Sequence, residues 1–153
     1  ILPPDSRRRR LLGAGAGIVA YVMVRPVVAA PAELAAAMEA FAGGKLVAPG
    51  RVMLDVAALV DNGNSVPVTI SVDSPMTAAD HVTTIALFNE RNPERDVAVF
   101  TLSPRSGRAR VSTNIRLATS QKLVAVAQMS DGTFWSRSVD VVVVLAACIE
   151  GEP

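Results

Sequence analysis

The chain is poor in the side chains that most active sites use. Its 153 residues include one cysteine, Cys148, and one histidine, His81, and only 4% are aromatic. A single cysteine excludes a disulfide within the chain, and one cysteine with one histidine cannot supply the four ligands of a structural zinc ion. Catalysis needs groups that move protons, attack a substrate or hold a metal. The composition therefore disfavours an enzyme with its own catalytic site.

The remaining chemical candidates have structural explanations. Cys148 and His81 could form a nucleophilic pair, but His81 follows Asp80 at the expected start of a strand, where a local hydrogen bond is the commoner role. Three arginines share one face of an expected strand: Arg108, Arg110 and Arg116. They could attract an anion or an acidic partner, although an exposed sheet face explains them equally well. Solvated turns account for the acidic candidates, and the core accounts for the aromatic ones. The acidic candidates are Asp73, Asp80, Glu90, Glu94 and Asp96, and the aromatic candidates are Phe134 and Trp135.

The N-terminal segment has the order of an export signal. The arginines at 7–10 precede an uncharged run, Leu11–Val24, and small residues follow at 28–32. A helix of 14 residues would span about 21 Å, less than the bilayer core of about 30 Å, so a permanent membrane anchor is disfavoured. The arginines and the two leucines after them resemble a twin-arginine signal. We expect a signal peptide at 1–32, cleaved after Ala30 or Ala32, and export to the periplasm.

Cleavage would change the charge of the protein. The full chain has 15 basic and 14 acidic residues, a net charge of +1. Removal of residues 1–32 takes away five arginines and one aspartate, which leaves 10 basic and 13 acidic residues, a net charge of −3. The basic character belongs to the signal, so nucleic acid is not an expected partner.

Export makes Cys148 the most informative residue. An odd cysteine in an exported protein suggests an intermolecular bond or a reactive thiol. Cys148 lies near the C-terminus, and the residues after it, 149–153, are polar and unfavourable for a strand. A reactive group at the tip of a tail can enter the active site of another protein, which favours a covalent carrier. The alternative is a buried cysteine that ends an apolar strand, in a non-catalytic binding or assembly module.

The pattern over 33–145 predicts an all-β domain with one short N-terminal helix. Leu34, Met38 and Phe41 share one face of a helix at Glu33–Ala42, which the two following glycines would end. The strand over Val66–Val72 alternates clearly, and its Pro67 indicates that it starts at an edge. Seven short segments have strand character: 51–55, 66–72, 81–88, 97–102, 108–117, 122–129 and 134–144. Asp-Gly at 131–132 predicts a hairpin between the last two. Together they indicate an Ig-like antiparallel β-sandwich.

Several segments resemble the SoxY family, the sulfur carriers of the bacterial thiosulfate-oxidising Sox system. They are Ser71-Val-Asp-Ser-Pro-Met-Thr-Ala-Ala-Asp-His81, Ser106-Gly-Arg-Ala109, Val111-Ser-Thr-Asn-Ile-Arg-Leu-Ala118 and Ala127-Gln-Met-Ser-Asp-Gly-Thr-Phe-Trp135. The first of these is the most specific, and the resemblance runs from about Phe41 through Cys148.

The resemblance implies an Ig-like sandwich that forms a heterodimer with a SoxZ subunit in the periplasm. It implies that sulfur is carried covalently on a cysteine near the C-terminus, which matches Cys148. In the family, the haem enzyme SoxAX attaches thiosulfate, the dimanganese hydrolase SoxB releases sulfate, and the sulfane dehydrogenase SoxCD oxidises the remaining sulfur. The carrier itself holds no cofactor. The apolar segments Val66–Val72, Lys122–Met129 and Phe134–Leu145 are consistent with a partner subunit, because they offer more β surface than a small domain needs to bury.

The predicted carrier arm, residues 146–153, departs from the family pattern. The family has Gly-Gly-Cys-Gly-Gly at the end of the chain, whereas here Ala146, Ala147, Ile149, Glu150 and Gly151 surround the cysteine. Glycines give a thin and pliable arm. Ile149 adds bulk, and Glu150 adds a charge that disfavours the reactive thiolate. The sequence leaves open a divergent carrier with altered partners, a less active paralogue, or an altered C-terminus.

Overall fold

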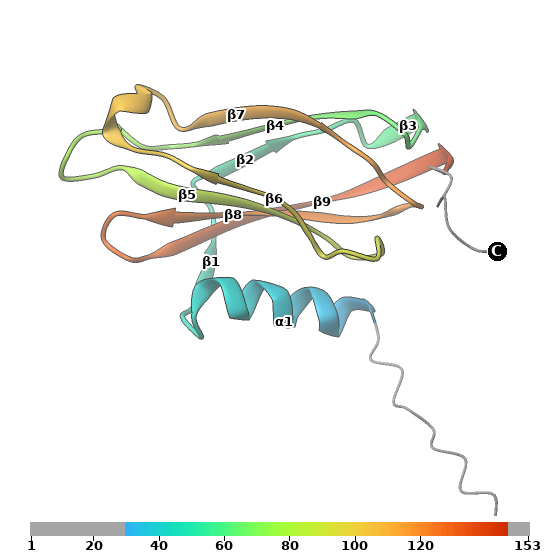
Figure 1. The fold of residues 1–153 in the computed structure, drawn as a ribbon, viewed down its shortest axis with the longest axis horizontal. Coiled ribbons are helices and arrows are strands. Elements are labelled where there is room, and N and C mark those ends of the chain that lie inside the picture. The colour runs from blue at the N-terminus through green and yellow to red at the C-terminus, as the bar shows by residue number, and fades with distance from the viewer. Residues whose placement is uncertain (1–29, 147–153) are drawn as a thin grey trace, which may run out of the picture.

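The computed structural model describes residues 30–146, which form two packed β-sheets with one helix against the larger sheet (Figure 1). The larger sheet has the strand order β1-β9-β8-β5-β6, with β3 also paired to β9, and the smaller sheet has the order β2-β4-β7. The elements are α1 (Ala30–Ala42), β1 (Val47–Pro49), β2 (Val52–Asp55), β3 (Leu59–Asn62), β4 (Val66–Val72), β5 (Val82–Asn89), β6 (Asp96–Thr101), the 3-10 turn η1 (Pro104–Ser106), β7 (Arg110–Ile115), β8 (Gln121–Met129) and β9 (Phe134–Leu145). The predicted all-β sandwich with an N-terminal helix is confirmed.

The main core lies between the two sheets and follows the alternation seen in the sequence. In β4 the even positions from Val66 to Val72 point inward and are buried. In β7, Val111 and Ile115 also join this core, whereas Arg110 and the other alternate residues are exposed. Residues of β5 and β8 complete it from the opposite sheet, chiefly Ile85, Leu87, Leu123, Ala125 and Ala127. Burial of these apolar side chains, at about 25 cal/mol per Å², is the main force that holds the sheets together.

A second, smaller core lies beneath α1. Leu34 is buried and Phe41 is half-buried, and the Phe41 ring meets Phe88 and Phe134 edge-on at centroid distances of 5.7 and 5.9 Å. Gly44 ends the helix at a φ of 76°, and its N–H donates to the carbonyl of Glu39 at 3.0 Å. The predicted helical face is therefore confirmed. The helix begins at Ala30, so it includes residues 30–32 of the predicted signal.

The structure differs from the prediction in two strand details. Within residues 30–146 there are nine strands instead of seven, because β1 and β3 have only three and four residues and carry little local pattern. Both pair in parallel with β9, so the sandwich is not purely antiparallel. The expectation that the strand over Val66–Val72 starts at an edge holds at Pro67, because β2 begins to pair only at Thr69. Beyond that point β4 is the central strand of its sheet.

The β8–β9 hairpin turn and the end of β9 lie at opposite ends of the sandwich. The β8–β9 hairpin turn lies at one end, where the N–H of Met129 donates to the carbonyl of Thr133 at 2.9 Å, and β9 runs from there to Leu145 at the other end (Figure 1). No helix within residues 30–146 is long and apolar enough to cross a membrane.

Candidate functional site

The predicted carrier arm lies almost wholly outside the described residues. Ala146 is exposed and directly follows β9. Ala147, Cys148, Ile149, Glu150 and Gly151 come after the last described residue. The part of the site that the structure describes is therefore the base of the arm, the end of β9 from which the chain leaves the domain.

Hydrogen bonds from two segments, the residues that flank β3 and the loop before β8, hold the end of β9. The Val142 N–H donates to the carbonyl of Ala58 at 2.8 Å, and the Val143 N–H donates to the hydroxyl of Ser120 at 2.9 Å. The carbonyl of Leu145 accepts from the N–H of Gly63, also at 2.8 Å. Because these bonds extend to the last residue of the strand, the arm begins from a defined position.

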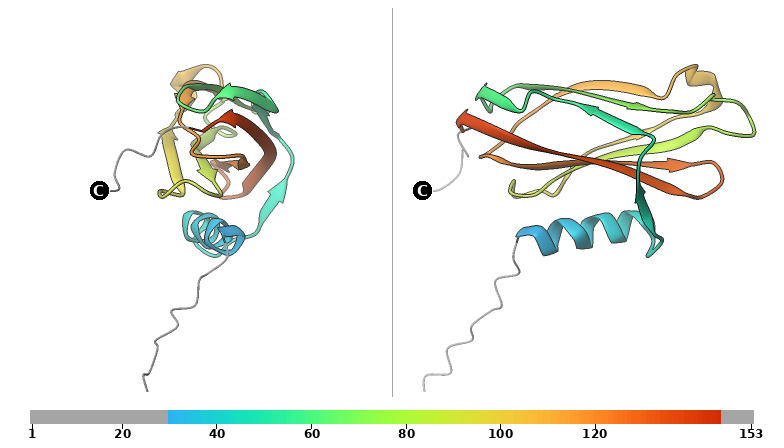
Figure 2. Two further views of the ribbon diagram at one scale, coloured as in Figure 1. Left: turned by 90° about the vertical axis from the view of Figure 1, so that its right-hand side faces the viewer. Right: turned by 180° about the vertical axis from the view of Figure 1, so that it is seen from behind.

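An exposed apolar surface surrounds this position. We call it the arm-base patch, and its side chains keep half or more of their surface in water: Leu59 62%, Val142 53%, Val144 61% and Leu145 64%. Val142 and Val144 alternate with Val141 and Val143, which point into the main core. Leu59 is in register with Val142 on the neighbouring strand β3. The views in Figure 2 show the ends of β3 and β9 side by side, at a distance from α1, so the helix leaves this face uncovered.

Acidic side chains border the arm-base patch. Asp61 is exposed between Val60 and Asn62, which pair with Val143 and Leu145. Asp140 lies two residues before Val142 and is paired with Lys122 at 3.0 Å. The patch therefore has an apolar centre, with Asp61 and the Asp140–Lys122 ion pair at its border.

His81 has the structural role that its position predicts. Its Nδ1 lies 3.0 Å from the carbonyl oxygen of Thr77, and its backbone N–H donates to the hydroxyl of Ser130 at 3.1 Å. Nearby, the Thr77 hydroxyl accepts from the N–H of Asp80 at 3.1 Å, and the sulfur of Met76 accepts from the N–H of Val82 at 3.4 Å. Residues 71–81, the segment with the most specific resemblance, contain the end of β4 and the loop that leads to β5. These hydrogen bonds hold that loop in place.

The other predicted candidates do not converge on a reactive site. Arg108, Arg110 and Arg116 are exposed, and none forms an ion pair with another residue of the described range. Phe134 is buried under α1 and Trp135 is half-buried against the main core, as expected. Within residues 30–146, no group of three or more His, Cys, Asp or Glu side chains is placed to hold a metal ion.

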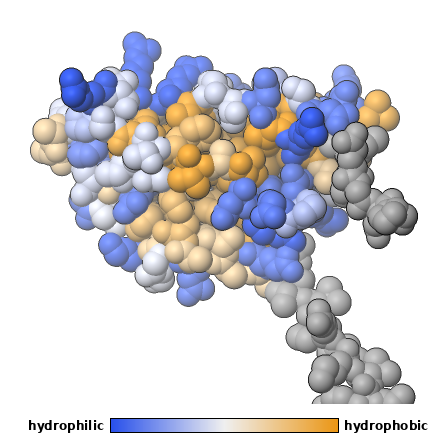
Figure 3. All heavy atoms as spheres, in the orientation of Figure 1, coloured by the Kyte–Doolittle hydropathy of each residue, from blue (hydrophilic) through white to orange (hydrophobic). Residues whose placement is uncertain are grey.

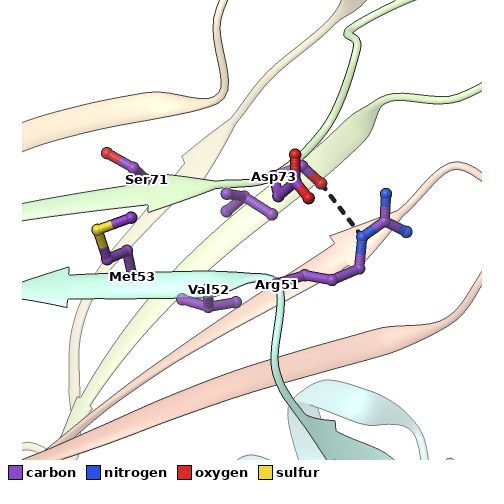
Figure 4. A pocket seen from close by; sticks show the side chains of 6 residues that line it. Arg51, Val52, Met53, Ser71 and Asp73 are labelled. Carbon is purple, nitrogen blue, oxygen red and sulfur yellow. Dashed lines mark hydrogen bonds between the residues drawn. The ribbon is translucent and has the colours of Figure 1, made fainter.

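A hollow of 520 Å³ lies on the outer side of β2 and β4, and Arg51, the one basic side chain that lines it, already has two partners (Figure 4). The Nε of Arg51 donates to the carbonyl of Asp73 at 3.1 Å, and its guanidinium lies 3.7 Å from Asp80. Figure 4 shows the guanidinium directed away from Met53 and Ser71. No polar groups point together into the hollow, which disfavours a small-molecule site there.

A second apolar surface lies on the side of the sandwich where β6 forms the edge of the larger sheet. Figure 3 shows apolar side chains across the middle of this face. Val99 on β6 is 56% exposed, and Val97 and Phe100 are half-buried against the main core. The predicted excess of β surface is therefore only partly correct. Segments 66–72 and 122–129 bury their apolar side chains within the domain, and only the end of the third segment is open.

The sequence and the fold were compared with those of known proteins. The family model described as sulfur oxidation protein SoxY matches residues 37–148. Among curated proteins, no sequence matches the chain. The structure of the sulfur carrier protein SoxY from Chlorobium limicola f thiosulfatophilum is 28% identical, covers 74% of this chain and 97% of its own, and superposes with a TM-score of 0.61.

Two less similar structures share the fold alone. The superoxide reductase (neelaredoxin) from Ignicoccus hospitalis is 19% identical, with 61% of this chain and 80% of its own covered and a TM-score of 0.55. The superoxide reductase from Nanoarchaeum equitans is 12% identical, with coverages of 63% and 100% and a TM-score of 0.54. Their names describe enzymes, but likeness at these identities extends only to the sandwich and not to its chemistry.

Proposed function

Because the chain belongs to the SoxY family of sulfur oxidation proteins, a family of carriers, we propose that it carries sulfur covalently on Cys148 during thiosulfate oxidation. The observation that supports this most directly is the extent of the family match, which runs from residue 37 to residue 148 and so includes the only cysteine. The described residues supply no competing reactive group. The protein presents its cargo to partner enzymes and has no catalytic site of its own.

The proposed loading step is an oxidation. The Cys148 thiolate and the outer sulfur of thiosulfate form an S–S bond, and two electrons leave to the haem enzyme SoxAX. In the next step, catalysed by SoxB, water attacks the oxidised sulfur and the bond between the two thiosulfate sulfurs breaks. Sulfate and two protons leave, and the outer sulfur stays on Cys148 as a persulfide. Where SoxCD is present, it oxidises this remaining sulfur.

The proposal includes a location and a stable partner. The expected signal at 1–32 directs the protein to the periplasm, and a SoxZ-like subunit binds the domain at 33–145 to form a heterodimer. Neither a nucleic acid nor a permanent membrane anchor is part of the proposal. The arm, 146–153, stays free of the subunit so that Cys148 can enter each enzyme in turn.

Intact-mass spectrometry tests the assignment. Protein purified from the periplasm of cells given thiosulfate should carry sulfur-containing adducts, and Cys148→Ala should remove them all. Adducts that remain on the variant would overturn the assignment to Cys148. Alkylation of the folded protein separates a carrier from a binding module with a structural cysteine, because a buried thiol stays unlabelled. Co-expression with SoxZ, followed by size-exclusion chromatography, tests the heterodimer.

A further inference from the structure

The arm is too short to carry Cys148 far from the domain. Three peptide steps separate Leu145 from Cys148, and a fully extended chain gains at most about 3.3–3.6 Å per residue, so the two Cα atoms are within about 11 Å. An enzyme that closes on the sulfur of Cys148 therefore brings its own surface to the end of β9. The residues that it meets there form the arm-base patch.

The patch has the composition of a docking surface. Leu59, Val142 and Val144 lie together on two paired strands, whereas such side chains are usually covered in a small domain. The backbone beneath them is held by the bonds to Ala58 and Gly63, so contact with a partner costs little ordering of the chain. Charge also limits the choice of partner. Asp61 at the border forms no ion pair within residues 30–146, whereas Asp140 is already paired with Lys122, so the charge of Asp61 favours a partner surface with lysine or arginine beside its apolar centre.

We propose that the arm-base patch is the docking surface for the enzyme that adds or removes sulfur at Cys148. The proposal rests on the carrier function above and adds the surface through which the enzyme recognises the carrier. The occupant is a transient partner with an apolar centre and a basic group opposite Asp61. A transient occupant is favoured over a stable subunit, because Cys148 lies within about 11 Å of Leu145 and must stay accessible to each enzyme in turn.

Variants that keep the shape of the strand test this surface. In the double variant Val142→Thr and Val144→Thr, each valine is replaced by a β-branched residue of similar size, and both positions are exposed, so the fold should be retained. Val99→Thr is the matched control, because it makes the same change at a similarly exposed valine on β6. The mature protein with its SoxZ subunit is loaded by SoxAX with thiosulfate and an electron acceptor. Loading is followed by intact mass.

In the double variant, KM for loading should rise about tenfold while kcat stays nearly unchanged, so kcat/KM falls about tenfold. The reason is that docking contacts stabilise the bound ground state and the transition state equally. Val99→Thr should load like the natural protein, and iodoacetamide should alkylate Cys148 at one rate in all three. Asp61→Lys should slow loading most at low salt, where charge attraction is least screened.

Different failures have different consequences. Equal loading of the double variant and the natural protein overturns the docking proposal and leaves the carrier function intact. Loss of SoxZ binding by the double variant, seen as a smaller species in size-exclusion chromatography, also overturns it, because the patch would then be the subunit interface. If the natural protein carries no sulfur adduct in cells given thiosulfate, although Cys148 is alkylated, the proposed carrier function fails and the docking proposal fails with it.

Discussion

The carbonyl oxygen of Leu145 accepts a 2.8 Å hydrogen bond from the backbone N–H of Gly63, whose own carbonyl accepts an equally short bond from Leu117. Gly63 is buried and lies between β3 and β4, and Leu117 follows β7. These two bonds connect the last residue of β9 to the segment after a strand of the opposite sheet. The base of the predicted arm is therefore fixed by the whole sandwich and not by β9 alone.

Ser120 should be the side chain that most affects the order of this base. Its hydroxyl accepts the N–H of Val143 at 2.9 Å. Ser120→Ala would leave this half-buried N–H without its partner, at a cost of about 1 kcal/mol in the free energy of unfolding. Denaturant unfolding should show that loss, and hydrogen exchange at the Val143 amide should become faster.

Ser120→Thr is the control for this change, because it keeps a hydroxyl at the same position. It should retain most of the stability and the protection at Val143. Equal exchange rates in the alanine variant and the natural protein would show that the Ser120 hydroxyl does not protect this amide in solution.

The hairpin turn offers a test at low pH. The hydroxyl and the backbone N–H of Thr133 donate to one carboxylate oxygen of Asp131 at 2.7 and 2.8 Å. These bonds, with a smaller contribution from the charge of Arg51, hold the pKa of the Asp131 carboxyl below its ordinary value of 3.8. Since the folded-state pKa is depressed, the stabilisation is complete above pH 3.8 and is lost as the pH falls through the folded-state value.

Thr133→Val removes the larger of these causes, the side-chain hydrogen bond, and should raise the pKa of Asp131 toward 3.8 without reaching it, because the backbone bond remains. Titration of the carboxyl by NMR measures the change. Thr119→Val, at an exposed position in the loop between β7 and β8, should leave the titration curve unchanged. A curve unaltered by Thr133→Val would mean that the hydroxyl bond is absent in solution.

Local pattern was sufficient for the parts of the fold that rest on periodicity. The alternation from Val66 to Val72 and the helical face of Leu34, Met38 and Phe41 depend on one element each, and both are as predicted. β3 could not be recognised in this way, because Leu59–Asn62 is short and runs into turn residues. Its parallel partner in β9 lies more than 80 residues away, and no local pattern encodes such a pairing.

The arm-base patch was hidden in the sequence for a related reason. The valines at 141–144 form a continuous apolar run, so nothing in the residue types distinguishes the buried Val141 from the exposed Val142. The distinction comes from tertiary structure, because α1 covers the outer face of β9 near Phe134 and leaves the end of the strand open. A better signal would have been Leu59, a large apolar residue only two positions before the turn residues that begin at Asp61.

Residues 146–153 lack the glycines that flank the cysteine in the family, and the effect of this difference can be measured. The comparison is direct, since β9 gives the same starting point to any arm attached to Leu145. Replacing residues 146–153 by Gly-Gly-Cys-Gly-Gly should speed loading by SoxAX, because glycines pass a narrow channel more easily. Between the single changes, Ile149→Gly should recover more loading than Glu150→Gln. The bulk of Ile149 acts at contact, whereas the charge of Glu150 is screened over about 10 Å at 0.1 M salt.

The two causes can be separated by reagent size. Glu150→Gln should raise the rate of alkylation of Cys148 by iodoacetamide at neutral pH, because loss of the carboxylate favours the thiolate. Ile149→Gly should leave alkylation nearly unchanged and act only on loading by the enzyme. If the natural arm already loads as fast as the glycine arm, the bulk at position 149 is tolerated and the chain is an ordinary carrier. If neither arm loads while both thiols are alkylated, the enzymes that use this carrier differ from those of the family, because the arm would then be reactive but not recognised.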